Sequence, residues 1–347
     1  MNRLYLTVSI LFLSIGCFAQ LGGVHLYDFL ASPASARTTG LGGTLIMVQD
    51  GDVAQVQQNP ALSNSQMDDK VSINNIFHFA GINEGMLAYS FSRDSLKMHF
   101  HTALQYVSYG EFIQADPTGA QIGTFRANEM ALLMGASRQM NERIRLGTNL
   151  KVLFANYASA NGFGLGLDLG ATYTVPGKNW SIGAVAQNIG YSFNNFATTR
   201  NNLPFDLKLG YSYRLKHLPF RYTITGHHLY QWDIRYRDEN VTETDFTGQI
   251  IEENIYKAFA DNFFRHFVFS GEFLFGRRGL FNIRFAYNHL RRQELKVSTF
   301  RGLGGFSLGF GMHIKRFQLD YGLGFYHLEG ATNHLGVTMT LGDNWNN

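Results

Sequence analysis

The sequence predicts an all-β fold: a closed antiparallel transmembrane β-barrel of about fourteen strands with an N-terminal plug segment. Three observations predict it. The chain starts with an export signal, apolar residues alternate with polar or small ones over long stretches, and no other run approaches the ~20 apolar residues of a spanning helix. The composition agrees, because 37 Gly, 30 Phe and 17 Tyr accompany only 6 Pro. A net charge of +3 argues against nucleic acid as a partner.

Residues 1–19 have the pattern of a secretory signal peptide. Arg3 supplies a positive charge, residues 4–15 form an apolar core, and Ala19 precedes the expected cleavage site. The single cysteine, Cys17, then leaves with the peptide, so we expect a mature chain without disulfides or thiol chemistry. A lipoprotein signal ending at Cys17 is the alternative, although Ser14 stands where a Leu is usual.

Strict alternation is clearest between residues 161 and 175. Seven alternate positions are apolar: Phe163, Leu165, Leu167, Leu169, Ala171, Tyr173 and Val175. The positions between them are glycine, aspartate or threonine, so one face of the strand is apolar and the other is small or polar. The stretch is longer than the ~5–6 residues usual in soluble strands. Lipid outside and a polar lumen inside explain it better than the core of a soluble sandwich.

The same pattern divides the chain from Lys70 to Leu341 into about fourteen strands, an even number as in bacterial barrels. We place them near 70–79, 84–92, 97–109, 127–138, 143–157, 161–175, 179–190, 204–215, 219–234, 263–276, 280–292, 302–314, 316–328 and 333–341. Connections after even-numbered strands are short, whereas those after odd-numbered strands include the long ones near 110–126, 191–203 and 235–262. This arrangement is typical of outer-membrane barrels with their long loops outside the cell.

Residues 20–69 precede the first strand and are rich in Gly, Ser and Ala, with Pro33 and Pro60. The segment is long for a tail, and its side chains are too small to make a core of their own. We therefore expect it to fold back as a plug into the lumen of the barrel formed by residues 70–347. Glycines on the lumen side of the strands would leave room for it.

Short motifs in this N-terminal segment carry a resemblance. They are Tyr27-Asp28-Phe29-Leu30, Ser32-Pro33-Ala34-Ser35-Ala36-Arg37, Gly40-Leu41-Gly42-Gly43 and Asn59-Pro60-Ala61-Leu62. With the barrel pattern they resemble the PorV/FadL-like family, and in particular the fatty-acid-transporter-like barrels of the Bacteroidetes type IX secretion system. The resemblance covers nearly the whole mature chain and marks as plug-motif residues Arg37, Gly42, Gly43, Asn59 and Pro60. One departure is the C-terminus, because residues 343–347 do not end in the terminal aromatic common in outer-membrane barrels.

The resemblance implies a non-catalytic role without cofactors. Such barrels are embedded in outer-membrane lipid as parts of a surface attachment complex, where they hold a PorZ-like partner beside a PorU-like sortase and a PorV-like shuttle. The wider family implies an alternative, the transport of hydrophobic small molecules across the outer membrane. A lipid-acting enzyme on the barrel wall is a weaker third alternative, because no Gly-x-Ser-x-Gly motif is present and no Ser–His pair is singled out.

Four histidines are candidate metal ligands. His99 and His101 share one face of a predicted strand but lack a third ligand, so we expect lumen histidines rather than a metal pair. His227 and His228 are neighbours in a predicted strand, where they would point to opposite faces and could not bind one ion together. We therefore expect no metal site.

The expected lumen face carries glycines and charges. Glycines at 162–166 and 302–305 lie inside predicted strands, so we expect lumen clearance or strand bending rather than dinucleotide binding. The charged residues at strand positions expected to face the lumen are Arg145, Lys151, Asp168, Asp206, Lys208, Arg214, Glu272, Arg284 and Asp320. They could select a solute, but we favour pairing with one another and with Arg37, Asp50 and Asp52, because buried charges are retained chiefly when partnered.

The connection from Arg235 to Asp261 is the strongest candidate for binding a partner. Among many charges it carries the apolar residues Tyr236, Phe246, Ile250, Ile251, Ile255, Tyr256 and Phe259. Ile251, Ile255 and Phe259 recur at a spacing of four, which predicts a short amphipathic helix. Packing of this loop over the barrel mouth explains the apolar residues equally well, so both interpretations stay open.

Overall fold

A computed structural model describes residues 26–157, 160–193, 202–235, 254–276, 279–296, 302–327 and 330–342. The expected signal peptide, residues 1–19, lies outside these ranges. Within them, fourteen strands form a closed antiparallel barrel, which confirms the predicted fold class. Each strand pairs with its neighbours in sequence, and the last pairs with the first.

The strands are β1 (Lys70–Phe77), β2 (Asn83–Arg93), β3 (Met98–Ala115), β4 (Gln121–Gln139), β5 (Ile144–Tyr157), β6 (Ala160–Thr174), β7 (Trp180–Ser192), β8 (Asp206–Arg214), β9 (Phe220–Gly226), β10 (Phe267–Phe275), β11 (Phe281–Asn288), β12 (Phe306–Ile314), β13 (Phe317–His327) and β14 (Gly330–Thr340). Two helical turns, η5 (Phe79–Gly81) and η6 (Asp94–Leu96), join β1 to β2 and β2 to β3.

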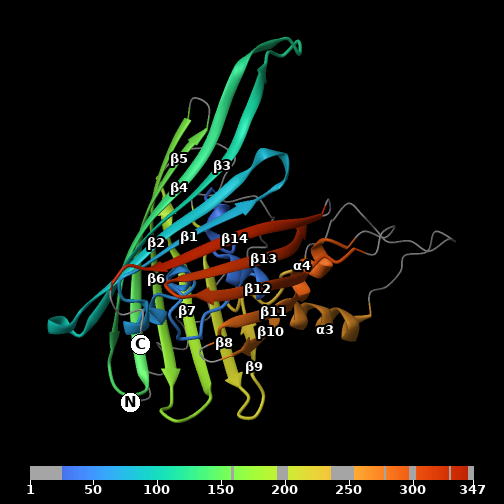
Figure 1. The fold of residues 1–347 in the computed structure, drawn as a ribbon. Helices are drawn as coiled ribbons and strands as arrows, with labels where there is room; N and C mark the ends of the chain where they lie inside the picture. The colour runs from blue at the N-terminus through green and yellow to red at the C-terminus, as the bar shows by residue number, and fades with distance from the viewer. Residues whose placement is uncertain are drawn as a thin grey trace, which may run out of the picture.

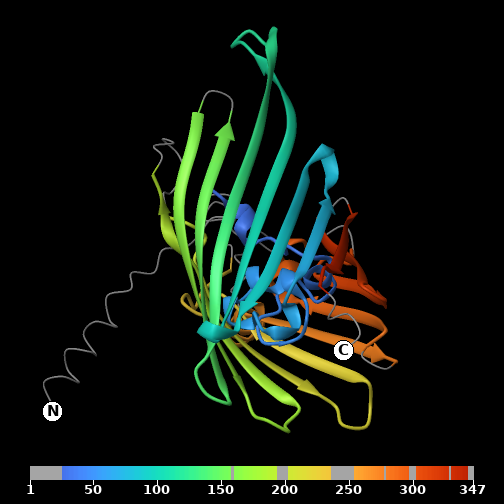
Figure 2. The ribbon, with the colours of Figure 1, turned by 60° about the vertical axis from the view of Figure 1, so that its left-hand side comes forward.

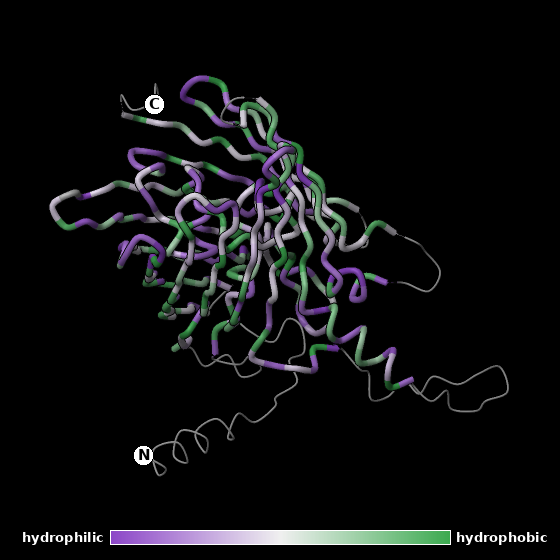
Figure 3. The backbone as a smooth tube through the Cα atoms, turned by 90° about the horizontal axis from the view of Figure 1, so that it is seen from below, coloured by the Kyte–Doolittle hydropathy of each residue, from purple (hydrophilic) through white to green (hydrophobic). Residues whose placement is uncertain are grey.

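Side chains alternate across the barrel wall as the sequence pattern requires. In β5, Leu146 and Leu150 face outward with 44% and 47% of their surface exposed, whereas Asn149 and Lys151 face the lumen and are buried. The strands in Figure 3 change repeatedly between hydrophobic and hydrophilic colours along their length. The outer wall is therefore apolar and suited to lipid, while polar groups gather inside.

β3 and β4 extend into the stretch 110–126, so the prediction of a long loop there is wrong. Asp116 closes the hairpin, because its carboxylate accepts hydrogen bonds from the backbone N–H groups of Thr118 and Ala120. A self-paired ribbon satisfies its own backbone groups and needs no alternation of apolar residues, which is why the sequence pattern did not reveal it. In Figure 2 the ribbon rises beyond the other strands.

β9 ends at Gly226, whereas the alternation predicted a strand as far as residue 234. The backbone of His228 has a φ of 54°, in the left-handed region that a continuing strand does not adopt. The Asp206 carboxylate accepts a hydrogen bond from the His228 N–H at 2.6 Å and holds this turn. The prediction that His227 and His228 lie inside a strand and point to opposite faces is therefore wrong.

Two helices stand at the long-loop end of the barrel (Figure 1). The first, α3 (Ile255–Arg265), is capped by the side chain of Asn254, and it confirms the predicted helix from residue 255 onward. The second, α4 (His289–Glu294), replaces the predicted end of a strand. Among the described residues, no helix is long and apolar enough to span a membrane.

Residues 26–69 lie inside the barrel, as the blue segment of Figure 1. They form the turns η1 (Asp28–Ala31), α2 (Ala36–Gly40), η2 (Val53–Gln57), η3 (Pro60–Leu62) and η4 (Ser65–Met67). Four of the five begin at a Ser, Asp or Asn whose side chain accepts a hydrogen bond from an N–H of the first turn. Short polar caps thus order a segment that has no long apolar run. We call residues 26–69 the plug.

Candidate functional site

The motif Asn59-Pro60 packs the plug against β5 and β6. The Asn59 amide nitrogen donates to the carbonyl oxygen of Ile46 at 2.7 Å, and its side-chain oxygen accepts from the N–H of Ala61 at 2.9 Å. A Cβ added at Gly170 of β6 would lie 2.0 Å from that oxygen. Glycine at this position therefore allows the Asn59 side chain to lie against the wall.

Amide side chains from the wall complete this contact. The Gln187 side chain donates to the carbonyl oxygens of Gln57 and Gln58, each at 2.9 Å, and the Asn149 side chain donates to that of Val56 at 3.0 Å. These contacts are uncharged, and each satisfies a buried carbonyl of the plug. We call this surface the neutral face; it comprises residues 56–60 of the plug and Asn149, Gly170 and Gln187 of the wall.

The helix α2 lies against β12, β13 and β14. A Cβ added at Gly322 of β13 would meet the carbonyl oxygen of Ala36 at 2.2 Å, and one added at Gly336 of β14 would lie 3.4 Å from the Ala36 Cβ. The motif residues Gly42 and Gly43 follow α2 with φ values of 85° and 95°, which favour glycine. Glycines thus serve both the close approach of α2 to the wall and the turn that ends it.

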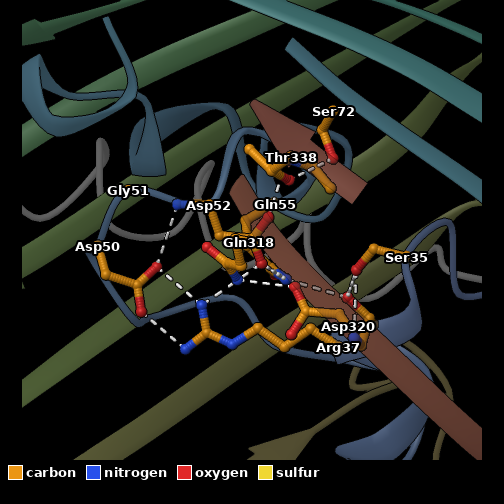
Figure 4. Close-up of polar contacts among 12 residues, drawn as sticks. Ser35, Arg37, Asp50, Gly51, Asp52, Gln55, Ser72, Gln318, Asp320 and Thr338 are labelled. Carbon is orange, nitrogen blue, oxygen red and sulfur yellow. Dashed lines mark hydrogen bonds and ion pairs between the residues drawn. The ribbon is translucent and has the colours of Figure 1, made fainter. Parts of the chain in front are cut away.

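Arg37 extends from α2 into a buried network of charges, shown in Figure 4. Its guanidinium donates to the two carboxylate oxygens of Asp50 at 2.9 and 2.7 Å. It also forms ion pairs with Asp52 of the plug at 3.4 Å and with Glu272 of β10 at 3.2 Å. Bidentate pairing of this kind fixes both the position and the orientation of a guanidinium.

On the wall, Glu272 is the centre of this network. Its carboxylate contacts Arg221 of β9 and Arg284 of β11, the latter at 2.8 Å, and Arg284 contacts Asp320 of β13 at 2.6 Å. The predicted pairing is confirmed for Glu272, which contacts Arg37 of the plug, and for Arg284 and Asp320, which contact each other on the wall. We call this surface the charged face; it comprises Arg37, Asp50, Asp52, Arg221, Glu272, Arg284 and Asp320.

The pKa values of the two plug carboxylates of the charged face, Asp50 and Asp52, are shifted in opposite directions. Burial alone would raise the pKa of Asp50, but the neighbouring Arg37 and Arg221 hold it below its ordinary value of 3.8. Burial raises the pKa of Asp52 above that value, and Arg37 offsets this only in part. Asp50 is thus the better stabilised anion of the two.

The remaining predicted lumen charges form two further ion pairs, Lys151–Asp168 at 2.9 Å and Lys208–Asp206 at 3.6 Å. Arg145 instead donates to the plug carbonyl of Ser63 at 2.9 Å. Arg214 is exposed at the end of β8. Ion pairing therefore accounts for most of the charged side chains that were predicted to face the lumen.

Two cavities lie on either side of α2. The larger, of about 980 Å³, is lined by five residues of the charged face and by the short turns of the barrel, including Lys315. The five are Arg37, Asp50, Asp52, Arg221 and Arg284. The smaller, of about 380 Å³, is lined at the long-loop end by Thr39, His78 and Tyr326. Because α2 supplies Arg37 to one cavity and Thr39 to the other, this helix stands between them.

The predicted partner-binding residues lie partly on α3. There Ile255, Tyr256 and Phe259 are 80%, 86% and 59% exposed. The ring of Phe259 lies 5.3 Å from that of Trp232, so packing within the loop region involves Phe259. Outside the described residues lie Tyr236, Phe246, Ile250 and Ile251.

The predicted lumen histidines have separate partners. A ring nitrogen of His99 contacts the Ser92 hydroxyl at 2.7 Å, and one of His101 contacts the side-chain oxygen of Asn149 at 2.6 Å. His101 is thus tied to a residue that also binds the plug.

The two glycine motifs differ in position. The glycines at 162–166 lie in β6, where a Cβ added at Gly166 would lie 3.0 Å from Leu203, as expected for lumen clearance. Those at 302–305 precede β12, and a Cβ added at Gly305 would lie 2.8 Å from the backbone nitrogen of Arg292. The prediction that they lie inside a strand is wrong, because regular alternation begins only at Phe306.

Three wall residues of the site were not singled out from the sequence, namely Arg221, Asn149 and Gln187. The alternation along each strand could have pointed to them, because it places Arg221 on the same lumen-facing side of β9 as Thr223. The alternation of side chains along a strand predicts that a residue faces the lumen, but it does not predict which group of the plug that residue contacts.

Comparison with solved structures identifies the same fold in transport proteins. The Ralstonia pickettii toluene transporter TbuX aligns with 90% of this chain and 98% of its own, at 10% identity and a TM-score of 0.53. The Pseudomonas putida toluene transporter TodX aligns with 88% of this chain and 96% of its own, at 12% identity and a TM-score of 0.50. No protein-family model and no curated protein sequence matches the chain. The chain thus has the closed-barrel fold of these two outer-membrane-type structures.

Proposed function

We propose that this protein transports hydrophobic small molecules across the outer membrane and that its plug closes the passage. The observation that carries the proposal is the position of α2 between a cavity at the long-loop end and a larger one at the short-turn end. The shared fold of two toluene transporters supports the same class of solute for this chain. Neither a catalytic step nor a cofactor is part of the proposal.

The passage would follow β13 and β14 from one cavity to the other. Tyr326 and Thr332 of these strands line the smaller cavity, whereas Gln318 and Thr338 line the larger one. Between the cavities α2 rests on glycines and covers the wall. A displacement of α2 from these strands would therefore join the two cavities.

A disulfide between α2 and β14 tests this gate. The distance of 3.4 Å between the Ala36 Cβ and a Cβ at Gly336 is close to the ~3.5–4.5 Å of a disulfide. We expect cells with the oxidised double variant A36C/G336C to take up labelled toluene no faster than cells without the protein. Reduction should restore uptake, because it frees α2.

The single variants A36C and G336C are the matched controls. G336C alone moves the Asn74 side chain, whose oxygen lies 2.3 Å from the added Cβ, so it measures the cost of that shift without a lock. Uptake by the oxidised double variant equal to that of the single variants would refute gating by α2. Absence of toluene uptake by the wild-type chain would refute transport of this solute class.

A second function is favoured by the exposed apolar residues of α3. In this alternative the chain is a PorQ-like, non-catalytic component of the type IX secretion system, anchored in outer-membrane lipid. It would hold a PorZ-like surface protein beside a PorU-like sortase and a PorV-like shuttle. The supporting observation is the high exposure of Ile255 and Tyr256, which a water-facing helix does not need.

Isolation of the protein from its native membrane in mild detergent distinguishes the two functions. We expect the variant I255S/Y256S/F259S to lose a bound PorZ-like protein if α3 is the anchor. The variant I113S/I122S removes apolar residues that are each 61% exposed on the β3–β4 ribbon and serves as a matched control. Retention of the partner by both variants would refute the role of α3.

A further inference from the structure

Three potential metal ligands gather at the long-loop end of β8 and β9. Asp206 begins β8, and His227 and His228 follow the end of β9. One ligand atom from each lies within 4.8 Å of the other two. The Nδ1 atoms of the two imidazoles are 2.5 Å apart. None of the three residues lines either of the two cavities of the proposed passage.

The backbone explains how two neighbouring histidines face each other. Successive side chains of a strand point to opposite faces. The φ of 54° at His228 breaks that alternation and turns its ring toward His227, so that the ring centroids lie 4.8 Å apart. A left-handed residue that is not glycine is uncommon, and such residues cluster at binding sites.

The Nε2 of His227 is buried with no hydrogen-bond partner among the described residues. Two imidazoles and one carboxylate gathered in this way form a ligand set that one cation can share.

We propose that Asp206, His227 and His228 bind one divalent transition-metal ion, for which zinc is the best fit. Two imidazole nitrogens and one carboxylate oxygen are a common zinc ligand set, with a fourth position left for water. Zinc at ~2.0–2.1 Å from each nitrogen needs the nitrogens about 3.3 Å apart, so the rings would separate slightly on binding. The ion would tie β8 to β9 at the start of the longest connection.

Lys208 makes the proposal sharply testable. Its ammonium lies 3.6 Å from the Asp206 carboxylate and donates to Gln187 at 2.6 Å. A fixed positive charge this close to the ligands opposes the binding of a second cation. Replacing it with an uncharged side chain, as in K208M, should therefore strengthen metal binding. An ion pair with a purely structural role predicts only a loss of stability.

The experiment uses the untagged full chain in detergent, stripped with a chelator and titrated with Zn²⁺ in a calorimeter and with Co²⁺ in a spectrophotometer. We expect one equivalent to bind and Co²⁺ to give the intense visible absorption of a four-coordinate site. H228N, which tolerates the left-handed backbone, should bind Zn²⁺ at least about 100-fold more weakly, because only two ligands remain.

The control variant H217A removes an exposed histidine outside the cluster and should bind Zn²⁺ like the wild type. K208M should bind Zn²⁺ more tightly than the wild type. Equal affinities of the wild type and H228N, or the absence of one-equivalent binding by the wild type, would overturn the proposal. Thermal unfolding without metal shows whether H228N folds, so loss of structure is distinguished from loss of a ligand.

Discussion

The neutral and charged faces hold the same plug to the same wall by different chemistry. On the neutral face, Asn59 and its neighbours meet glycine and amide side chains through uncharged hydrogen bonds. On the charged face, Arg37 is held by carboxylates from both the plug and the wall. On the neutral face, attachment of the plug depends on close packing against the wall. On the charged face, it depends on the exclusion of water from the ion pairs.

This difference indicates where the plug can separate from the wall. Ion pairs lose most of their attraction when water enters, because their energy falls with the local dielectric constant. The charged face borders the cavity of about 980 Å³, so water can reach it once α2 shifts. The neutral face is buried, and its glycines allow contacts that any movement would lose. We infer that the neutral face stays in place while α2 and the plug residues of the charged face, Arg37, Asp50 and Asp52, move away from the wall.

The largest expected effect comes from Glu272, the carboxylate shared by Arg37, Arg221 and Arg284. In E272Q the three guanidinium groups keep their burial but lose this common counter-charge. We expect a loss of about 3–5 kcal/mol in the free energy of unfolding, as for other buried ion pairs broken on one side. Denaturant titration in detergent, followed by intrinsic fluorescence, measures it.

An exposed ion pair provides the control for Glu272. Glu111 and Arg126 lie 3.6 Å apart on the β3–β4 ribbon, with side chains 50% and 78% exposed. E111Q should leave the free energy of unfolding unchanged within error, because water already solvates both charges. An effect of E272Q as small as that of E111Q would show that the charged face does not hold the plug.

A smaller effect is expected on the neutral face. In G170A the added Cβ lies 2.0 Å from the Asn59 side-chain oxygen, so the plug motif must shift. We expect a loss of about 1–3 kcal/mol in the free energy of unfolding, as for other overpacked sites. The matched control is G123A on the β3–β4 ribbon, where the added Cβ meets only a Gln114 side-chain atom at 3.9 Å. Equal stability of the two variants would contradict the tight fit of the neutral face.

The fold could be predicted from the sequence because lipid and lumen impose a period of two along every strand. The strand β5, with Leu146 outside and Lys151 inside, shows this directly. The prediction failed where the local backbone structure is determined by contacts outside the barrel wall and not by the alternation of lipid-facing and lumen-facing residues. The β3–β4 ribbon satisfies its own backbone, and β9 stops early because His228 adopts a turn that Asp206 holds.

The site could be predicted only in part, for a related reason. The alternation along the strands predicted that Glu272 and Arg284 face the lumen. Because buried charges need partners, Arg37 and Asp50 of the plug could be predicted to pair with lumen charges. The neutral face and the cluster at Asp206 depend on contacts between segments far apart in the chain. A single sequence does not say that Gly170 lies beneath Asn59, because both residues are ordinary in their own strand or turn.

The smallest expected effect separates Asp50 from Asp52 within the charged face. A carboxyl group whose folded pKa is lowered contributes stability that is present above its unfolded value near 3.8 and is lost as the pH falls through the folded value. Asp50 is such a group. Asp52 has a raised pKa, so its contribution has the opposite sign: it is present below 3.8 and is lost as the pH rises through the folded value.

At pH 7 we therefore expect D50N to unfold at a lower denaturant concentration than the wild type and D52N at an equal or higher one. Asn at position 52 can still cap η2 by accepting the Ala54 N–H, so D52N removes the charge and keeps the cap. The gap between D50N and the wild type should narrow as the pH falls below 3.8, because Arg37 then faces a protonated Asp50 in the wild type too. If D52N were the less stable variant at pH 7, Asp52 rather than Asp50 would be the principal plug anion for Arg37. The charged face would then be held chiefly through the Arg37–Asp52 ion pair instead of through the bidentate pair of Arg37 with Asp50.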